Sequence, residues 1–247
     1  MNKPTPREAW RAAALTMMTV DELRLILRGE DAAVWVEAAA ACGLAEAQVR
    51  LGRMLLEGEG TARDPERALA CFAAAAESGD ADGHNMLGRC FENGWGTEKD
   101  LAVAARHYRI AAEAGLDWAQ YNLGHMLLSG SGVPRDRILA FDFYGLAAAQ
   151  GHVRAMNLVG RCYEQGWGVT QDLNAARAWY QRSAEGGYFR GAYNFADMLA
   201  NDGCITDAQH WFAQALGSAP EPSRSLMVTA LLAHKEPILR ALAKTRP

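Results

Sequence analysis

The sequence lacks most of the features that mark enzymes, nucleic-acid-binding proteins and membrane proteins. No segment comes near the roughly 20 consecutive apolar residues that a membrane-spanning helix requires. The motifs HExxH, CxxC, GxSxG, SxxK and GxxxxGK[ST] do not occur, so the usual metal, nucleophile and phosphate sites have no candidate residues. The formal net charge is −4, and binding along nucleic acid needs a positive field. We therefore expect a noncatalytic protein with no metal or cofactor and no nucleic-acid or membrane partner.

Cysteine is also scarce, with five residues among 247. The number is odd and the spacing is irregular, which argues against a disulfide framework. The first residues, MNKPTPREAWR, lack the apolar core and cleavage site of a signal peptide. Together these observations predict a cytoplasmic protein with reduced thiols.

What the sequence does contain is a repeat of 36 residues. One column of the repeat consists of the glycines Gly43, Gly79, Gly115, Gly151 and Gly187. A second column consists of Gly52, Gly88, Gly124 and Gly160, with Ala196 in the fifth place. Self-similarity at a fixed period of this size is typical of a solenoid, in which each unit buries its apolar face against its neighbours.

Each period predicts two helices separated by a GxG loop. Asp64, Asp100, Asp136 and Asp172 stand where the second helix begins, and an Asp side chain there can accept hydrogen bonds from free backbone N–H groups. Gly115 and its equivalents can end that helix in the left-handed conformation. A glycine inside the first helix, such as Gly88, costs roughly 1 kcal/mol relative to alanine, so we expect a close helix crossing there.

Two segments carry a family resemblance. AQYNLGHMLLSGSGV at 119–133 and NAARAWYQRSAEGG at 174–187 resemble the SLR (Sel-one-like repeat) pattern AxxxLGxxYxxGxGVxxDxxKAxxWYxxAAxxG, a relative of the tetratricopeptide repeats. The resemblance covers about 32–216. It implies an all-α fold, a right-handed α-solenoid of helix pairs that holds protein partners, without naming the partner. A secreted branch of the family staples each helix pair with a disulfide, and that cysteine pairing is missing here.

The repeat pattern also predicts the domain organisation. We expect an N-terminal helical cap over 1–31, the repeat solenoid over 32–216 with a degenerate first and a truncated last repeat, and a C-terminal cap or tail over 217–247. The last repeat is shortened, because Phe212 follows Tyr180 by less than one full period. Whether the C-terminal stretch packs on the solenoid or forms a loose tail is open at this stage.

The resemblance places the candidate binding surface on the first helix of each repeat, which lines the concave face in tetratricopeptide relatives. There an asparagine two residues before the glycine holds a peptide, and Asn122 and Asn194 match that position. Arginine, amide and aromatic side chains suit an acidic or C-terminal peptide segment. The candidate partner-binding residues are Arg89, Trp118, Tyr121, Asn122, Arg154, Asn157, Arg161, Tyr193 and Asn194.

Trp95 and Trp167 are possible loop contacts, because they occupy the variable place of the GxG loop. Such a ring either folds over the adjacent loop or contacts a partner. Both lie in the repeats that share GRC(F/Y)E(N/Q)GWG, so the repeating unit can also be read as a pair of consecutive repeats.

Three function hypotheses follow. The leading hypothesis is a protein–protein interaction scaffold that holds a partner segment in the groove of the first helices. The second is a hydrolase of the cysteine-rich β-lactamase-like type, which needs a nucleophile and a base that the sequence does not offer. The third is a helical-repeat RNA binder, which the acidic charge opposes.

Overall fold

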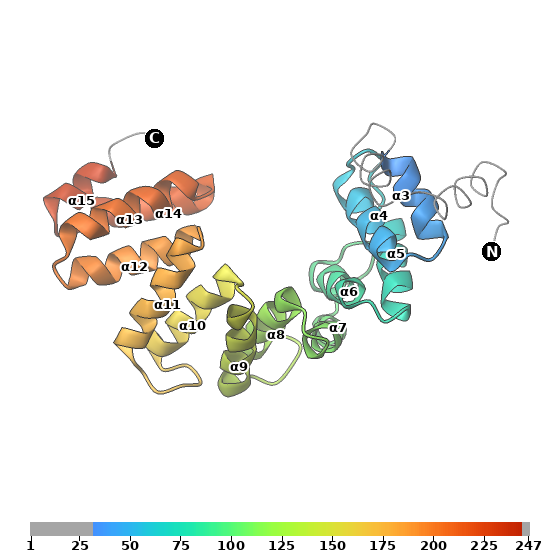
Figure 1. Ribbon diagram of the computed structural model, residues 1–247, viewed down its shortest axis with the longest axis horizontal. Coiled ribbons are helices and arrows are strands. Elements are labelled where there is room, and N and C mark those ends of the chain that lie inside the picture. Colours follow the sequence, from blue (N-terminus) through green and yellow to red (C-terminus); the bar gives the residue numbers. More distant parts are fainter. Residues whose placement is uncertain (1–31, 244–247) are drawn as a thin grey trace. The chain divides into compact units, whose positions relative to one another are not determined.

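The computed structural model describes residues 32–243, and this range contains thirteen helices and no strand (Figure 1). The predicted N-terminal cap over 1–31 lies outside the described residues. After α3 (Ala32–Ala41), each repeat supplies a first helix, helix A, and a second helix, helix B. Helix A of successive repeats is α4 (Ala45–Glu57), α6 (Ala81–Asn93), α8 (Asp117–Ser129), α10 (Val153–Gln165) and α12 (Phe189–Asn201). Helix B is α5 (Pro65–Glu77), α7 (Leu101–Glu113), α9 (Arg137–Ala149), α11 (Leu173–Glu185) and α13 (Ile205–Ser218). The all-helical repeat architecture is confirmed.

The helix boundaries follow from side-chain and backbone chemistry that the sequence predicts. The Asp100 carboxylate accepts hydrogen bonds from the backbone N–H groups of Ala102 and Val103, both at 2.9 Å, and thereby satisfies two donors at the start of α7. The equivalent cap residues of α5, α9 and α11 are Asp64, Asp136 and Asp172. Gly115 follows helix B with φ +93°, as the predicted helix stop requires.

Glycine inside helix A allows a close crossing with helix B of the same repeat. A Cβ atom built on Gly88 would lie 2.6 Å from the Tyr108 ring, and one on Gly160 would lie 2.8 Å from the Tyr180 ring. Both rings are fully buried, so they occupy the space that a side chain at the glycine would need. The predicted close crossing is therefore found in both repeats.

Neighbouring repeats contact each other through the second glycine of the GxG loop. A Cβ atom on Gly96 would lie 2.2 Å from the carbonyl oxygen of Pro65, at the first turn of the preceding helix B. Gly132 has the same relation to Leu101. Only glycine leaves room for this contact. The positive φ of +67° at Gly96 is a second reason why glycine is required there.

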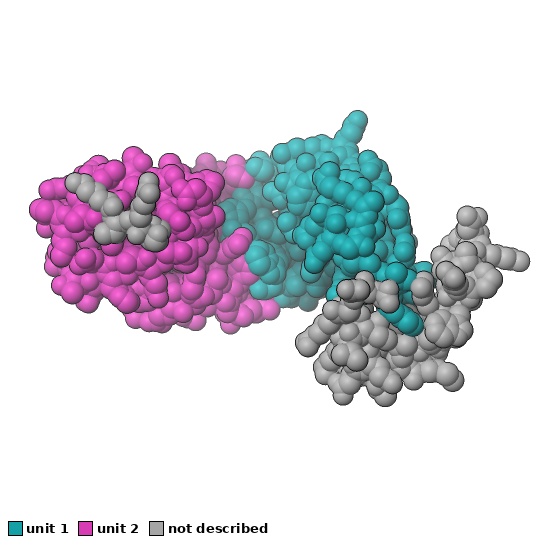
Figure 2. Space-filling view, turned by 90° about the horizontal axis from the view of Figure 1, so that it is seen from above, with its two compact units in different colours: residues 1–126, 130–134 teal, residues 127–129, 135–247 magenta. Residues whose placement is uncertain are grey.

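The described residues form two compact units (Figure 2). Unit 1 contains residues up to 126 together with 130–134, and unit 2 contains 127–129 together with residues from 135 onward. In unit 1, consecutive helices from α3 to α7 contact each other, around an apolar core that includes Leu55, Phe72 and Cys90. In unit 2, consecutive helices from α9 to α13 do so.

The C-terminal stretch packs on the last repeat. Two helices follow α13, namely α14 (Glu221–Leu232) and α15 (Pro237–Leu242), and both contact α13 (Figure 1). The buried side chains of Met227, Leu231 and Leu239 belong to the same apolar cluster as Phe212. The structure therefore favours a C-terminal stretch that packs on the solenoid over a loose tail. The predicted domain boundaries, 1–31, 32–216 and 217–247, stay a prediction.

Candidate functional site

In unit 1, α4 and α6 contact each other and border an open cavity of about 280 Å³. Its lining comes from both helices A and from the loops that follow them: Arg53, Leu56, Glu57, Arg63, Met86, Arg89 and Trp95. Sequence reasoning selected Arg89 and Trp95 as separate candidates, and the structure brings the two together.

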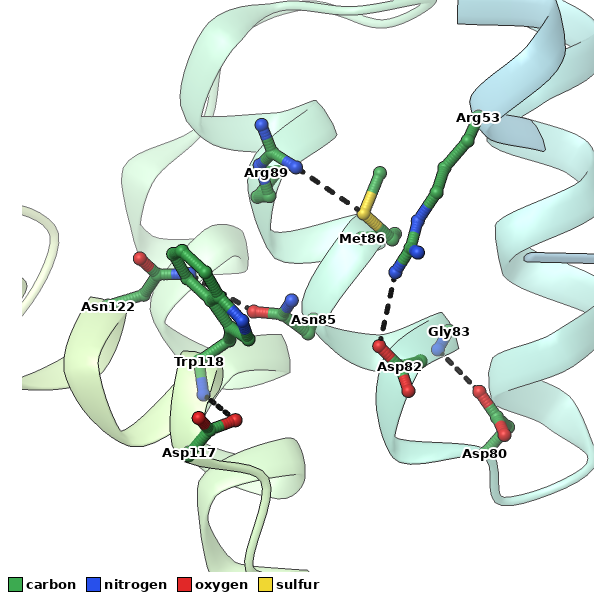
Figure 3. A network of polar contacts seen from close by, with 10 residues as sticks. All are labelled: Arg53, Asp80, Asp82, Gly83, Asn85, Met86, Arg89, Asp117, Trp118 and Asn122. Carbon is green, nitrogen blue, oxygen red and sulfur yellow. Dashed lines mark hydrogen bonds and ion pairs between the residues drawn. The ribbon is translucent and has the colours of Figure 1, made fainter. Parts of the chain in front are cut away.

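The arginines of this cavity are held in different ways. Arg53 forms an ion pair with Asp82 of α6 at 3.2 Å (Figure 3). Arg63 donates from Nε to the carbonyl oxygen of Leu56 at 3.0 Å, so the loop after α4 is tied to the end of that helix. Arg89 donates from Nη1 to the sulfur of Met86 at 3.7 Å, and its guanidinium carbon lies 5.1 Å from the centre of the Trp95 ring.

Both loop tryptophans are half-buried and lie against arginine. Trp95 packs against the apolar core of unit 1. In unit 2, the Trp167 ring centre lies 5.1 Å from the guanidinium carbon of Arg161 and 5.9 Å from that of Arg137. A cation over an aromatic face is attracted by the ring quadrupole, so each contact restrains an arginine on the protein surface. A partner contact through either ring stays a prediction.

The helix A asparagines are linked in pairs across neighbouring repeats. Asn122 of α8 donates from Nδ2 to Oδ1 of Asn85 in α6 at 3.1 Å (Figure 3). In unit 2, Asn194 of α12 donates to Asn157 of α10 at 2.9 Å. Asn85 and Asn157 are 5% and 6% exposed, whereas Asn122 and Asn194 are half-buried. Each pair therefore presents one amide at the surface and buries the other.

Aromatic side chains share helices with the surface asparagines, namely Trp118 and Tyr121 on α8 and Tyr193 on α12. In unit 1, Trp118 is 44% exposed and meets Tyr121 edge-on, with ring centres 6.1 Å apart. In unit 2, Tyr193 meets the buried Phe212 ring edge-on at 5.1 Å, and burial raises the pKa of the Tyr193 hydroxyl. Arg154 lies 5.9 Å from the Tyr188 ring. Each unit thus carries amide and aromatic side chains on its helices A.

Sequence reasoning did not identify Asn85 as the hydrogen-bond partner of Asn122, or Arg63 as a lining residue of the cavity. The signal for the first is the alternation along helix A, where Asn85 and Asn157 recur one place before Asn122 and Asn194, so that each bonded pair is 37 residues apart. The signal for Arg63 is its recurrence as Arg135, two repeats further along the chain.

Two of the thiols, those of Cys90 and Cys162, are buried in the core. Burial raises the pKa of the Cys90 thiol to about 12 and that of Cys162 to about 11, so both are protonated, apolar groups near neutral pH. All five cysteines are free thiols. Within residues 32–243, no three His, Cys, Asp or Glu side chains come together as a metal site. No described helix is long and apolar enough to cross a membrane.

Comparisons with known proteins agree with the repeat architecture. A family model described as the Sel1 repeat matches residues 45–80, 81–116, 119–152 and 153–188. No curated protein sequence matches significantly. A solved Sel1 repeat protein from Oxalobacter formigenes is 25% identical, with a TM-score of 0.75 over 91% of this chain and 97% of that chain.

Two further solved structures show the same helical arrangement. The protective antigen c5321 of uropathogenic Escherichia coli, which displays an SLR fold, is 29% identical with a TM-score of 0.70 over 88% of this chain. The match spans 46% of c5321, so this chain corresponds to less than half of that protein. The immunity protein Pa5087 of Pseudomonas aeruginosa, at 20% identity and a TM-score of 0.55, covers 82% of this chain and 76% of its own and is similar in fold alone.

Proposed function

Because the chain belongs to the Sel1 repeat family, whose members generally take part in protein–protein interaction, we propose that it is a noncatalytic adaptor that holds a segment of a partner protein against its helix A side chains. Members of this family are typically noncatalytic. In this proposal the partner segment contacts the polar and aromatic side chains described above. In unit 1 these are Arg89, Trp118, Tyr121 and Asn122.

The observation that carries the proposal is the repeated asparagine pair. A hydrogen bond to a buried neighbour positions the side chains of Asn122 and Asn194. Each therefore loses less side-chain entropy when a partner binds than a freely rotating asparagine would. Each retains an amide oxygen that can accept a hydrogen bond from a peptide N–H group. Neighbouring aromatic side chains supply flat contact area of the kind that dominates protein interfaces.

In unit 2 the proposal assigns direct contacts to Arg154, Arg161, Tyr193 and Asn194. Asn157 then acts by orienting Asn194, because its own side chain is buried. Trp95 and Trp167 act by restraining the arginines beside them.

The proposal is tested by site-specific photocrosslinking in native cell extract. A benzophenone-bearing residue is placed at Tyr121 in one variant, at Tyr193 in a second, and at Arg109 in a control. Arg109 is exposed on helix B. We expect the first two positions to form a covalent adduct with the same protein and the control position to form none.

Two outcomes would contradict the adaptor proposal. One is an adduct at Arg109 as strong as those at Tyr121 and Tyr193, which would place the contact on another face. The other is the absence of an adduct at both tyrosine positions while circular dichroism shows that each variant is folded.

A further inference from the structure

We infer that the cavity between α4 and α6 binds a side-chain carboxylate, so that the partner segment held by this protein is acidic. The inference rests on the proposed adaptor function and assigns a chemical class of ligand to one part of its surface. The residues that carry it are Arg63, Arg89 and Trp95, together with the apolar side chain of Leu56.

The charge of the cavity favours an anion. Three of its lining residues are arginines and one, Glu57, is acidic. Arg53 is already paired with Asp82 at 3.2 Å. In the part of the chain that the structure describes, no carboxylate pairs with Arg63 or Arg89. Arg63 and Arg89 therefore border one cavity without an ion pair to a described carboxylate, and they outnumber its one acidic lining residue, Glu57.

Both guanidinium groups are held in place, which lowers the entropy lost when a ligand binds. The bond from Arg63 Nε to the Leu56 carbonyl oxygen uses one donor and leaves the terminal nitrogens of Arg63 for a ligand. The Trp95 ring supports the Arg89 guanidinium from one side, and Met86 accepts one of its N–H groups. An arginine restrained in this way can offer two parallel N–H groups to a carboxylate.

The apolar part of the lining suits the rest of a glutamate or aspartate side chain. The half-buried side chain of Leu56, on α4, and the half-buried ring of Trp95 form the apolar part of the lining, whereas Met86 is only 2% exposed. Methylene groups of the ligand can pack on these surfaces while its carboxylate meets the arginines. A bare inorganic anion would leave this apolar surface unused.

Two contacts of this arrangement recur in unit 2, at the equivalent positions two repeats further along the chain. Arg135 donates from Nε to the Leu128 carbonyl oxygen at 3.0 Å, as Arg63 does to Leu56. Arg161 lies 5.1 Å from the Trp167 ring centre, the same distance as between Arg89 and Trp95. A polypeptide has one carboxyl terminus but many acidic side chains, so the recurrence of these arginine contacts favours side-chain carboxylates.

The test uses the whole protein and a defined probe. The probe is a fluorescein-labelled, carboxyl-amidated peptide of alternating glutamate and glycine, and its matched control has glutamine in place of glutamate. Binding is followed by fluorescence anisotropy at low ionic strength. We expect the glutamate peptide to bind and the glutamine peptide not to bind, because only the former carries carboxylates.

Single substitutions locate the binding. Arg63→Gln and Arg89→Gln are each expected to weaken binding of the glutamate peptide by about 10- to 150-fold, the usual effect of removing a charge-assisted hydrogen bond. Arg109→Gln removes the same charge from the exposed side of α7 and is expected to weaken it by less than about twofold, through screened long-range attraction alone. All three variants are first shown to be folded by circular dichroism.

The inference is overturned if the wild type binds both peptides equally, or if Arg109→Gln weakens binding as much as the two cavity variants do. Its failure is distinguishable from failure of the adaptor proposal. If the protein does not distinguish the glutamate peptide from the glutamine peptide but still crosslinks at Tyr121 and Tyr193, only the carboxylate site is disproved. If no crosslinking occurs, the adaptor function itself is disproved.

Discussion

At the scale of single residues, glycine has separate roles in this chain that a stability measurement can distinguish. Gly115 needs a left-handed backbone, with φ +93°, but a Cβ atom there would meet nothing within 4 Å. Gly96 has φ +67° and also touches the backbone of the preceding repeat at Pro65. Gly145, inside α9, has neither a positive φ nor a close neighbour.

Alanine at these three positions should therefore have three different effects on the free energy of unfolding, measured in urea. Gly115→Ala should lower it by about 1–2 kcal/mol, the cost of a left-handed alanine. Gly96→Ala should lower it by about 2–5 kcal/mol, because overpacking adds to that cost. Gly145→Ala should raise it by about 0.5–1 kcal/mol. Equal losses for Gly96 and Gly115 would show that the contact with Pro65 carries no energy.

At the scale of elements, α6 and α7 are joined by a pair of histidines. Nδ1 of His84 and Nδ1 of His107 lie 3.0 Å apart, and Phe91 stacks on the His107 ring with ring centres 5.8 Å apart. Burial lowers the pKa of both rings. The charge of Asp80 acts against that shift at His84, while at His107 the charges of His84 and Arg106 reinforce it. Because one of the two Nδ1 atoms must accept the hydrogen bond, the His84–His107 contact needs at least one uncharged imidazole.

The directions of these pKa shifts determine whether the free energy of unfolding rises or falls with pH. The unfolded chain, with histidine pKa values near 6.5, binds more protons than the folded chain as the pH falls through that value. The contribution of this pair to the free energy of unfolding should therefore be fully present above about pH 7 and decrease as the pH falls below about 6.5. Urea titrations at several pH values measure this slope.

The contribution of the pair is isolated by substitution. His107→Gln keeps a hydrogen-bonding side chain beside His84 and should reduce the slope. His210→Gln, on α13 in unit 2, is the matched control and should leave the slope unchanged. An unchanged slope in His107→Gln would exclude the pair as the source of the pH dependence.

At the scale of the whole molecule, the repeat is a structural module. Helices A begin 36 residues apart from Ala45 to Phe189, and in each unit consecutive helices contact each other. In a solenoid, stability is approximately the sum of repeat terms and nearest-neighbour interface terms. Whole repeats should therefore be removable, and fractions of a repeat should not.

Deletion of 81–116 removes α6, α7 and their loops and keeps the repeat register. We expect this variant to retain the helicity per residue of the parent by circular dichroism and to unfold cooperatively in urea at a lower denaturant concentration. Deletion of 81–98 removes α6 and leaves α7 without its partner helix. That variant should lose cooperative unfolding. Equal behaviour of the two deletions would contradict the modular description.

The candidate site was less predictable than the fold. The helix boundaries depend on residues next to each other in sequence, such as Asp100 with the two N–H groups that it caps, so a single column of aspartates suffices to place them. The candidate residues Asn122 and Asn194 were selected one by one, through the family resemblance. Their hydrogen bonds to Asn85 and Asn157 depend on how one helix A is rotated and shifted against the next. No local sequence pattern predicts that rotation and shift.

The sequence by itself determined the period, the two helices of each repeat and their caps, because local backbone preferences and a periodic apolar face set these features. Only the tertiary structure decided which side chains of different helices meet. The pairing of His84 with His107, and the grouping of Arg63 with Arg89 around one cavity, arise when helices pack at close distance. The physical reason is that contact between side chains far apart in sequence is fixed by packing geometry, which residue identity alone does not specify.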